Sequence, residues 1–256
     1  MLVEVAEEAA RAGAAVLVPR FGHERALASK SSPTDLVSEA DLASERAIRE
    51  VLRARRPDDG VLGEEGTGDV AGTTGLRWVV DPLDGTIDYL YGIPQWCVSV
   101  AVEDDAGAVA GVVFDPLRDE CFVAARGEGA SLNGRALPAG RAGDPPPLAQ
   151  ALVATGFGYD SRVREAQGAR VAALLPSVRD VRRAGSAALD LCWTALGRHD
   201  AYYEWGVQHW DHAAAGLVCR EAGLDVVELA GDDVLPRGLA AGPQPLLDAL
   251  LARLGA

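Results

Sequence analysis

The chain has 256 residues, of which 48% are hydrophobic and 24% are charged, and its formal net charge is −14. This length and composition suit a globular protein with a sizeable core, built as one large domain or as two closely packed halves. The negative charge makes nucleic acid and anionic membrane surfaces unsuitable partners. No apolar run reaches the ~20 residues of a membrane span.

The start of the chain, MLVE, has neither the basic residues nor the apolar run of a secretory signal. The four cysteines, Cys97, Cys121, Cys192 and Cys219, are far apart in apolar stretches, and no C-x-x-C pair occurs. We therefore expect buried, reduced cysteines in a cytoplasmic protein.

The first half of the sequence predicts two helices followed by a strand meander. A helical stripe runs from the start of the chain until Pro19 interrupts it, and a second helix is predicted over residues 38–55. The side chains expected on the inner side of the second helix are Leu42, Ile48, Val51, Leu52 and the aliphatic part of Arg55. Apolar runs separated by turn residues predict strands at residues 76–80, 95–102, 108–114 and 120–125, and Asn133-Gly134 marks another tight turn.

The clearest linker is GDPPP at residues 143–147, and strands and helices alternate after it. The predicted strands lie at residues 151–155, near 181, and at 201–203, 225–229 and 239–241. The predicted helices cover residues 163–175, 187–196, 212–222 and 244–254. The pattern indicates an α+β half over residues 1–142 and an α/β half over residues 148–256, in stacked layers.

One acidic string stands at the end of a predicted strand. Asp81 and Asp84 flank Pro-Leu and precede Gly85 and Thr86. Because proline forces a turn, the second carboxylate can point back toward the first. A helix that begins at Gly85 would direct free N–H groups at a bound phosphate. The shorter string DPL recurs at residues 115–117, where it indicates only a hairpin turn. The prediction of a functional site therefore depends on the full string DPLDGT.

Two other acidic positions near the N-terminus have structural alternatives. Glu64 and Glu65 follow a glycine at a strand end or loop, and they could be a solvated pair. Asp41 follows Ser38 by three residues, as in a capping box, although a helix start is also a place from which it could face a cation.

Asp211, in the string HWDH, could cap the helix that follows it. The two flanking residues, His209 and His212, would suit zinc, but no other cluster of histidine or cysteine supports that ion. Carboxylates and water favour Mg²⁺ or Mn²⁺ instead.

Four motifs together resemble the inositol monophosphatase family. KSSPTDLVSEAD at residues 30–41 is similar to the family segment that supplies a lysine and an aspartate for a third metal. GEE at 63–65, WVVDPLDGT at 78–86, and WD followed by AAAG at 210–216 are similar to the family's other signatures. Because the motifs occur in family order across nearly the whole chain, the resemblance implies a layered α-β-α-β-α sandwich of the sugar phosphatase type.

The resemblance also implies a set of site residues around two or three Mg²⁺ ions, with Mn²⁺ as a possible substitute. The implied metal ligands are Glu64, Asp81, the Leu83 carbonyl, Asp84 and Asp211, with Asp41 at a third, weaker site. The implied substrate-binding residues are Lys30, Asp84, Gly85, Thr86, Gly185, Ser186, Ala187 and Glu204. A further segment that looks familial and lies near the pocket, TGF at residues 155–157, has no assigned duty.

Electrostatics gives a separate reason to expect cations. Like charges 4 Å apart repel by roughly 4 kcal/mol at an effective dielectric of 20, and a phosphomonoester would add about two negative charges to these carboxylates. One metal would activate a water and a second would stabilise the leaving alkoxide. The catalytic residues Glu64 and Thr86, with Asp41 assisting through Thr86, would position and deprotonate that water without a covalent intermediate.

The substrate is expected to be a small phosphorylated polyol, with inositol 1-phosphate first because Glu204 matches a family glutamate that accepts hydrogen bonds from inositol. The alternatives are histidinol phosphate, fructose 1,6-bisphosphate and nucleotide phosphates, since GIPQW at residues 92–96 and Asp88 depart from the usual inositol monophosphatase pattern. A non-catalytic metal-binding regulator is the alternative of a different class. The resemblance further implies a lithium-sensitive homodimer.

Overall fold

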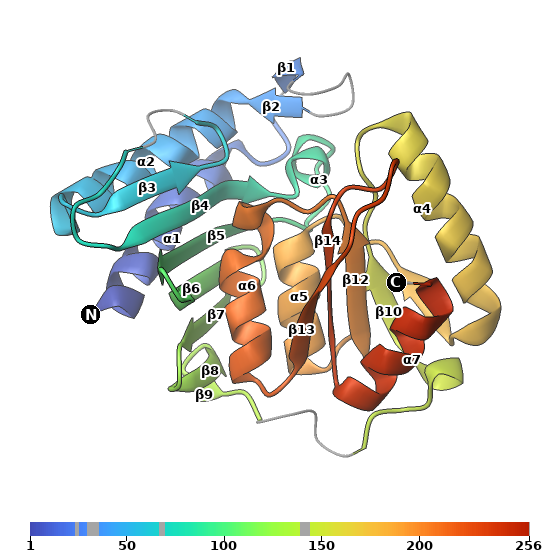
Figure 1. Cartoon of the computed structure of the whole chain (residues 1–256). Helices are drawn as coiled ribbons and strands as arrows, with labels where there is room; N and C mark the ends of the chain where they lie inside the picture. Colours follow the sequence, from blue (N-terminus) through green and yellow to red (C-terminus); the bar gives the residue numbers. More distant parts are fainter. Residues whose placement is uncertain (24–25, 30–35, 67–69, 139–143, 256) are drawn as a thin grey trace.

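The computed structural model describes residues 1–23, 26–29, 36–66, 70–138 and 144–255. Its elements form five layers, α-β-α-β-α, which confirms the fold implied by the family resemblance (Figure 1). None of the helices among these residues combines the length and hydropathy needed to cross a bilayer.

The first two layers come from the first half of the chain. The helices are α1 (Leu2–Leu17), which continues into the 3-10 turn η1 (Val18–Arg20), α2 (Glu39–Arg55) and the short α3 (Thr86–Leu90). A seven-stranded sheet has the order β3-β4-β5-β6-β7-β8-β9, with β3 and β4 parallel and the other neighbours antiparallel. Its strands are β3 (Gly60–Gly63), β4 (Arg77–Asp84), β5 (Cys97–Asp104), β6 (Gly107–Asp115), β7 (Glu120–Ala125), β8 (Gly129–Leu132) and β9 (Arg135–Ala136). A separate pair, β1 (Ala26–Ser29) and β2 (Leu36–Ser38), is antiparallel.

The second half supplies the remaining layers. A five-stranded sheet has the order β11-β10-β12-β14-β13, in which β10 runs parallel to both β11 and β12. Its strands are β10 (Leu152–Thr155), β11 (Asp180–Arg182), β12 (Ala201–Trp205), β13 (Asp225–Leu229) and β14 (Gly238–Gly242). The helical elements are the 3-10 turns η2 (Leu148–Gln150) and η3 (Leu175–Ser177) and the helices α4 (Ser161–Leu174), α5 (Ala187–Leu196), α6 (His209–Glu221) and α7 (Gln244–Leu254).

Strand periodicity explains the layering. Alternate residues of a strand face opposite sides, so Trp78 and Val80 of β4 pack in the cluster formed with α1 and α2, while Val79 packs in the cluster formed with α5 and α6. The α5 and α6 layer packs against both sheets in one continuous core (Figure 1). The division into halves at residues 142 and 148 stays a prediction.

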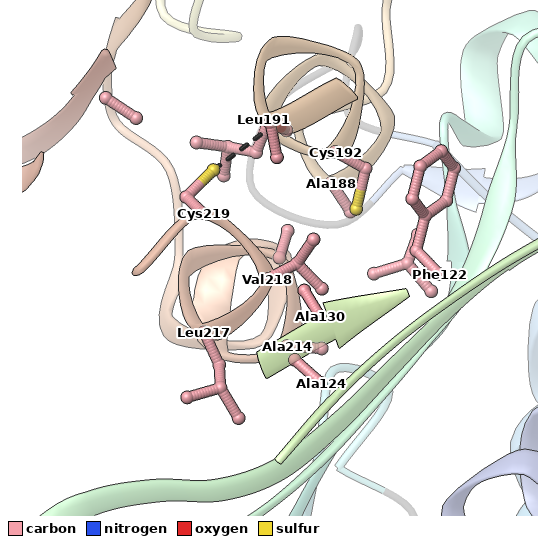
Figure 2. Packing of buried hydrophobic residues seen from close by; sticks show 14 of the residues in the cluster. Phe122, Ala124, Ala130, Ala188, Leu191, Cys192, Ala214, Leu217, Val218 and Cys219 are labelled. Atoms are coloured by element: carbon pink, nitrogen blue, oxygen red, sulfur yellow. Dashed lines mark hydrogen bonds between the residues drawn. The ribbon is translucent and has the colours of Figure 1, made fainter. Parts of the chain in front are cut away.

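The four cysteines are buried and unpaired, as expected. Figure 2 shows Cys192 of α5 and Cys219 of α6 among Leu191, Val218 and Phe122 in the central core. The Cys219 thiol donates a hydrogen bond of 3.2 Å to the Leu191 carbonyl. These side chains act as small hydrophobic residues in the packing between the two sheets.

The structure corrects several local predictions. Helix α6 begins at His209, with Gln208 as N-cap, so Asp211 is the third helical residue and not the cap of a helix starting at residue 212. The predicted inner side of α2 is confirmed at Ile48, Val51 and Leu52, which are buried or packed against the core, but Leu42 is only half-buried and Arg55 is exposed. The residues buried on this helix are Ala40, Asp41, Ser44, Glu45, Ile48, Arg49 and Leu52.

Candidate active site

A cavity of about 490 Å³ lies where the ends of β3 and β4 meet the starts of α3, α5 and α6 and the end of β12. Most of the residues singled out in the sequence line this cavity. They are Glu64, Asp81, Leu83, Asp84, Gly85, Thr86, Gly185, Ser186, Ala187, Glu204 and Asp211, together with residues 155–157. Asp41 lies behind the wall, and Lys30 lies outside the described residues.

Asp81 and Asp84 reach the cavity because β4 is irregular at its end. The pairing of β4 with β5 shifts register between these two residues, which brings both carboxylates to the cavity although an even strand would separate them. The Asp81 carboxylate accepts a 3.0 Å hydrogen bond from the Leu83 amide, which closes the turn. Gly85 follows with φ of +97°, a conformation that favours glycine, and α3 begins at the next residue as predicted.

Asp84 connects the end of β4 to the start of α5. Its Oδ2 accepts hydrogen bonds from the Ser186 hydroxyl at 2.6 Å and from the Ala188 amide at 2.7 Å. Ser186 is the N-cap of α5, where its hydroxyl also accepts a bond from the Leu189 amide. Asp84 therefore lies at a helix N-terminus, where free amides and the helix dipole stabilise a negative charge.

Thr86 is the centre of a short hydrogen-bonded chain. Its hydroxyl lies 3.0 Å from the Leu83 carbonyl and 3.1 Å from Asp41 Oδ1. The other oxygen of Asp41 accepts bonds from the amide and the hydroxyl of Ser38. The Asp41 amide donates back to the Ser38 hydroxyl, and this pair of amide bonds forms the predicted capping box of α2. Asp41 thus has both a structural contact with its own helix and a contact with the cavity wall through Thr86.

Glu64 and Asp211 complete the carboxylate cluster from two other elements. Glu64 directly follows β3, and its amide donates a 3.1 Å bond to the Val80 carbonyl. Asp211 Oδ2 accepts a 2.6 Å bond from the Gln208 amide in a second capping box. Four carboxylates from three separate segments, the end of β3, β4 and α6, therefore line one cavity.

The pKa values of these carboxylates are raised by their surroundings. Burial raises the pKa of Asp81 well above its usual value, and the charges of Glu64 and Asp84 raise it further. Burial and the charges of Asp84 and Glu64 likewise raise the pKa of Asp211. The pKa of Asp84 is raised less, to about 6, because the bonds from Ser186 and Ala188 oppose the burial effect. The carboxylates are close enough to repel one another, which a shared cation would relieve.

The donor set fits a hard divalent cation. All the donors are carboxylate oxygens or a backbone carbonyl, which suit Mg²⁺ or Mn²⁺ and not zinc. Among the described residues, no three side chains of His, Cys, Asp or Glu form a ready-made coordination shell. The fit therefore rests on ligand chemistry and mutual electrostatic coupling.

The opposite wall of the cavity carries a second group of polar residues. Glu204 of β12 accepts a 2.9 Å bond from the Tyr202 hydroxyl, and burial raises its pKa to about 7. Asp190 of α5 is buried, and no described residue donates a hydrogen bond to its Oδ1, although His199 Nδ1 lies 3.9 Å away. Burial raises the pKa of Asp190 well above its usual value, and the positive charge of Arg183 only partly opposes the rise at Asp190 and Glu204. Arg183 is the one basic residue in the described lining.

The inositol monophosphatase family model matches this chain over residues 1–255. The chain belongs to the inositol monophosphatase family. The resemblance found in its four motifs is thereby confirmed, as is the layered fold.

Individual members of the family are similar over most of the chain. The inositol-1-monophosphatase of Mycobacterium bovis is 46% identical over 88% of this chain and 83% of that protein. The protein named Nus factor SuhB of Haemophilus influenzae is 38% identical over 99% of this chain and 95% of that protein. The crystal structure of the extragenic suppressor protein suhB from Bartonella henselae has a TM-score of 0.89 and 34% identity, and it covers 99% of this chain and 98% of that one.

Asp190 and Arg183 were not among the residues predicted from the sequence to form the site. The signal for Asp190 was present, because a charged residue stands in the otherwise apolar helical run AALDLCW. Arg183 belongs to a pair of adjacent arginines, and the sequence alone does not distinguish which of them faces a cavity.

Proposed function

We propose that this family member is a Mg²⁺-dependent phosphomonoesterase whose preferred substrate is a small phosphorylated polyol, with inositol 1-phosphate first. The observation that carries the proposal is the convergence of Glu64, Asp81, Asp84 and Asp211 on one cavity beside the start of α3. An acidic cavity repels a phosphate unless cations lie between them. The donor types present are those that Mg²⁺ prefers.

In this proposal the ions are held by these four carboxylates and the Leu83 carbonyl, two or three ions in all, with Mn²⁺ as a substitute. When bound, Mg²⁺ would supply charge neutralisation and would lower the pKa of a coordinated water. Glu64 accepts the proton of the attacking water, and the Thr86 hydroxyl orients that water. Asp41 holds Thr86 through the 3.1 Å contact, while its own role as a ligand at a third site is a further part of the proposal.

The phosphate would lie against the backbone amides of Gly85 and Thr86 at the start of the helical turn. The substrate alcohol would then face the opposite wall, where Ser186 and Glu204 lie. When ionised, Glu204 can accept hydrogen bonds from several hydroxyl groups, which favours a polyol over an apolar alcohol.

A homodimer, inhibition by lithium and a cytoplasmic location are also part of the proposal, as is electrostatic support from Lys30. These rest on the family resemblance alone.

The relatives named Nus factor SuhB support a second candidate, a regulatory role that needs no catalysis. The formal charge of −14 argues against direct binding to nucleic acid and favours a protein partner. The cavity favours the enzyme, because a regulator would have no need for an assembled set of carboxylates beside Thr86.

The substrate assignment is tested by a panel of phosphomonoesters with Mg²⁺, in which kcat/KM is measured for each. The panel comprises inositol 1-phosphate, histidinol phosphate, fructose 1,6-bisphosphate, NADP and 3′-phosphoadenosine phosphate. We expect the highest kcat/KM for inositol 1-phosphate, and we expect Glu204→Gln to raise its KM more than that of histidinol phosphate. A clear preference for any other member of the panel would overturn the substrate choice but not the metal chemistry.

A further inference from the structure

The buried side of α2 is unusually polar near the cavity. Glu45 has no exposed surface and Arg49 is 7% exposed, and both lie one turn or more beyond the capping residues. Charged side chains are seldom fully buried unless they are paired. The pair is formed within the helix, where Arg49 Nε donates a 2.8 Å hydrogen bond to Glu45 Oε1.

The second oxygen of Glu45 reaches a different part of the chain. Its Oε2 accepts a 2.9 Å hydrogen bond from the backbone amide of Glu65. Glu45 therefore uses one oxygen for its charge partner and the other for the segment that carries Glu64. The helix and this segment are 20 positions apart in the sequence, so the contact is a tertiary one.

Gly63 shows how closely this segment lies against the ion pair. A Cβ atom at position 63 would lie 2.6 Å from Glu45 Oε2 and 2.7 Å from Arg49 Nη2, both closer than van der Waals contact allows. The backbone here rests directly on the two charged groups because residue 63 has no side chain.

Glu64 is consequently held from two sides. Its own amide donates to the Val80 carbonyl of β4, and the next amide donates to Glu45. The Gly66 amide donates back to the Gly63 carbonyl at 3.3 Å and closes the turn. Between these fixed points, the side chain of Glu64 faces the cavity.

A buried ion pair is a weak source of stability, because well-packed hydrophobic residues of similar volume often stabilise a protein equally well or better. A role in positioning explains the Glu45–Arg49 pair better than a contribution to stability does. The same face of α2 also supports the β4 turn, since the Ser44 hydroxyl donates a 2.9 Å bond to the Pro82 carbonyl.

We propose that Glu45, oriented by Arg49, is a positioning residue that fixes the 63–65 turn so that Glu64 is directed at the metal site. The inference rests on the proposed function, because it assumes that Glu64 binds a cation. The proposed role of Glu45 is to hold the backbone of residues 63–65, and Glu45 takes no part in a chemical step.

The first test is Glu45→Gln, which keeps the shape of the side chain but loses its charge. Arg49 and the Glu65 amide donate to different oxygens of Glu45, and in glutamine one of these positions is an NH2 group that cannot accept. We expect isothermal titration calorimetry of the metal-free protein to show Mg²⁺ affinity about 10- to 100-fold weaker, as is typical when a group supporting a metal ligand is changed. Amide hydrogen exchange of Glu65 should accelerate in the same variant.

The chain offers a matched control in Glu221, at the end of α6. Its carboxylate accepts 2.9 Å bonds from the amides of Gly127 and Gly129 and thus also holds a turn, but it does not line the cavity. Glu221→Gln should loosen that turn and leave Mg²⁺ affinity unchanged. Equal effects of the two variants on Mg²⁺ affinity would show a general loss of structure and would contradict the proposal.

Gly63→Ala gives a second test in which both charges remain. The added methyl group forces the turn and the ion pair apart, so Mg²⁺ affinity should fall as in Glu45→Gln while the protein stays folded by circular dichroism. Mg²⁺ binding within about twofold of wild type in either folded variant would overturn this inference alone. A wild-type protein that binds no Mg²⁺ would overturn the proposed function and this inference with it.

Discussion

Glu204 lies in the cavity wall with its pKa raised to about 7, mainly because it is buried. A carboxyl with a raised pKa binds its proton more tightly in the folded than in the unfolded protein. Its contribution to stability is therefore complete below the unfolded pKa, near 4.5, and it is lost as pH rises through about 7. Most of the change falls between pH 5 and pH 8.

Because this stabilisation is lost as pH rises, the wild type and Glu204→Gln should differ in how their free energies of unfolding depend on pH. The wild type should lose up to about 3 kcal/mol relative to the variant as pH rises from 5 to 8, because each unit of pKa shift corresponds to about 1.4 kcal/mol. Urea unfolding of both proteins in EDTA would measure this. A difference in unfolding free energy that stays constant with pH would show that Glu204 does not titrate in this range.

The sequence predicted the site residues that belong to a recognisable motif. Asp81, Asp84, Glu64 and Asp211 all line the cavity. Asp190 does so as well, but it lies on α5 without a motif of its own, and only the packing of α5 between the sheets brings it to the cavity. Residues that enter a site through tertiary packing leave little trace in local sequence.

The helix caps allow a prediction for whole elements. Ser186 caps α5 and Asp160 caps α4, so replacing either by alanine should cost about 1 kcal/mol of stability. Ser186 also donates a hydrogen bond to Asp84, whereas Asp160 lines the same cavity but, among the described residues, bonds only within its own helix start. Ser186→Ala should therefore weaken Mg²⁺ binding about 10-fold by calorimetry, whereas Asp160→Ala should not. Similar Mg²⁺ affinities in the two variants would contradict the role given to the Ser186–Asp84 bond.

Helices, long strands and the short strands of the second half were predicted to within a few residues, but short strands of the first half were missed. β3 and β9 have four and two residues and carry little pattern of their own. The inner face of α2 was predicted only in part, because hydrophobicity was used to assign it, whereas the buried residues there also include Asp41, Ser44 and Glu45. On the part of α2 next to the site, polar side chains that support the site are buried in place of the apolar residues that hydrophobic periodicity would select.

The arrangement of the whole molecule was predictable only through the family resemblance. Local patterns gave a meander followed by alternating strands and helices, but they did not indicate that α5 and α6 would lie between two sheets. That position depends on small residues such as Ala188, Ala214 and Ala130, which allow the helices to approach the strands closely (Figure 2). The cavity lies where these layers meet.

Phosphate release by the purified protein, with Mg²⁺ and with EDTA, tests the central claim most directly. Asp84→Asn is the companion variant, since it keeps the shape of Asp84 and removes its charge. We predict release from inositol 1-phosphate with Mg²⁺, none with EDTA, and a loss of at least about 100-fold in folded Asp84→Asn. Undiminished release in EDTA, or near-normal activity of Asp84→Asn, would contradict a metal-dependent phosphatase at this cavity.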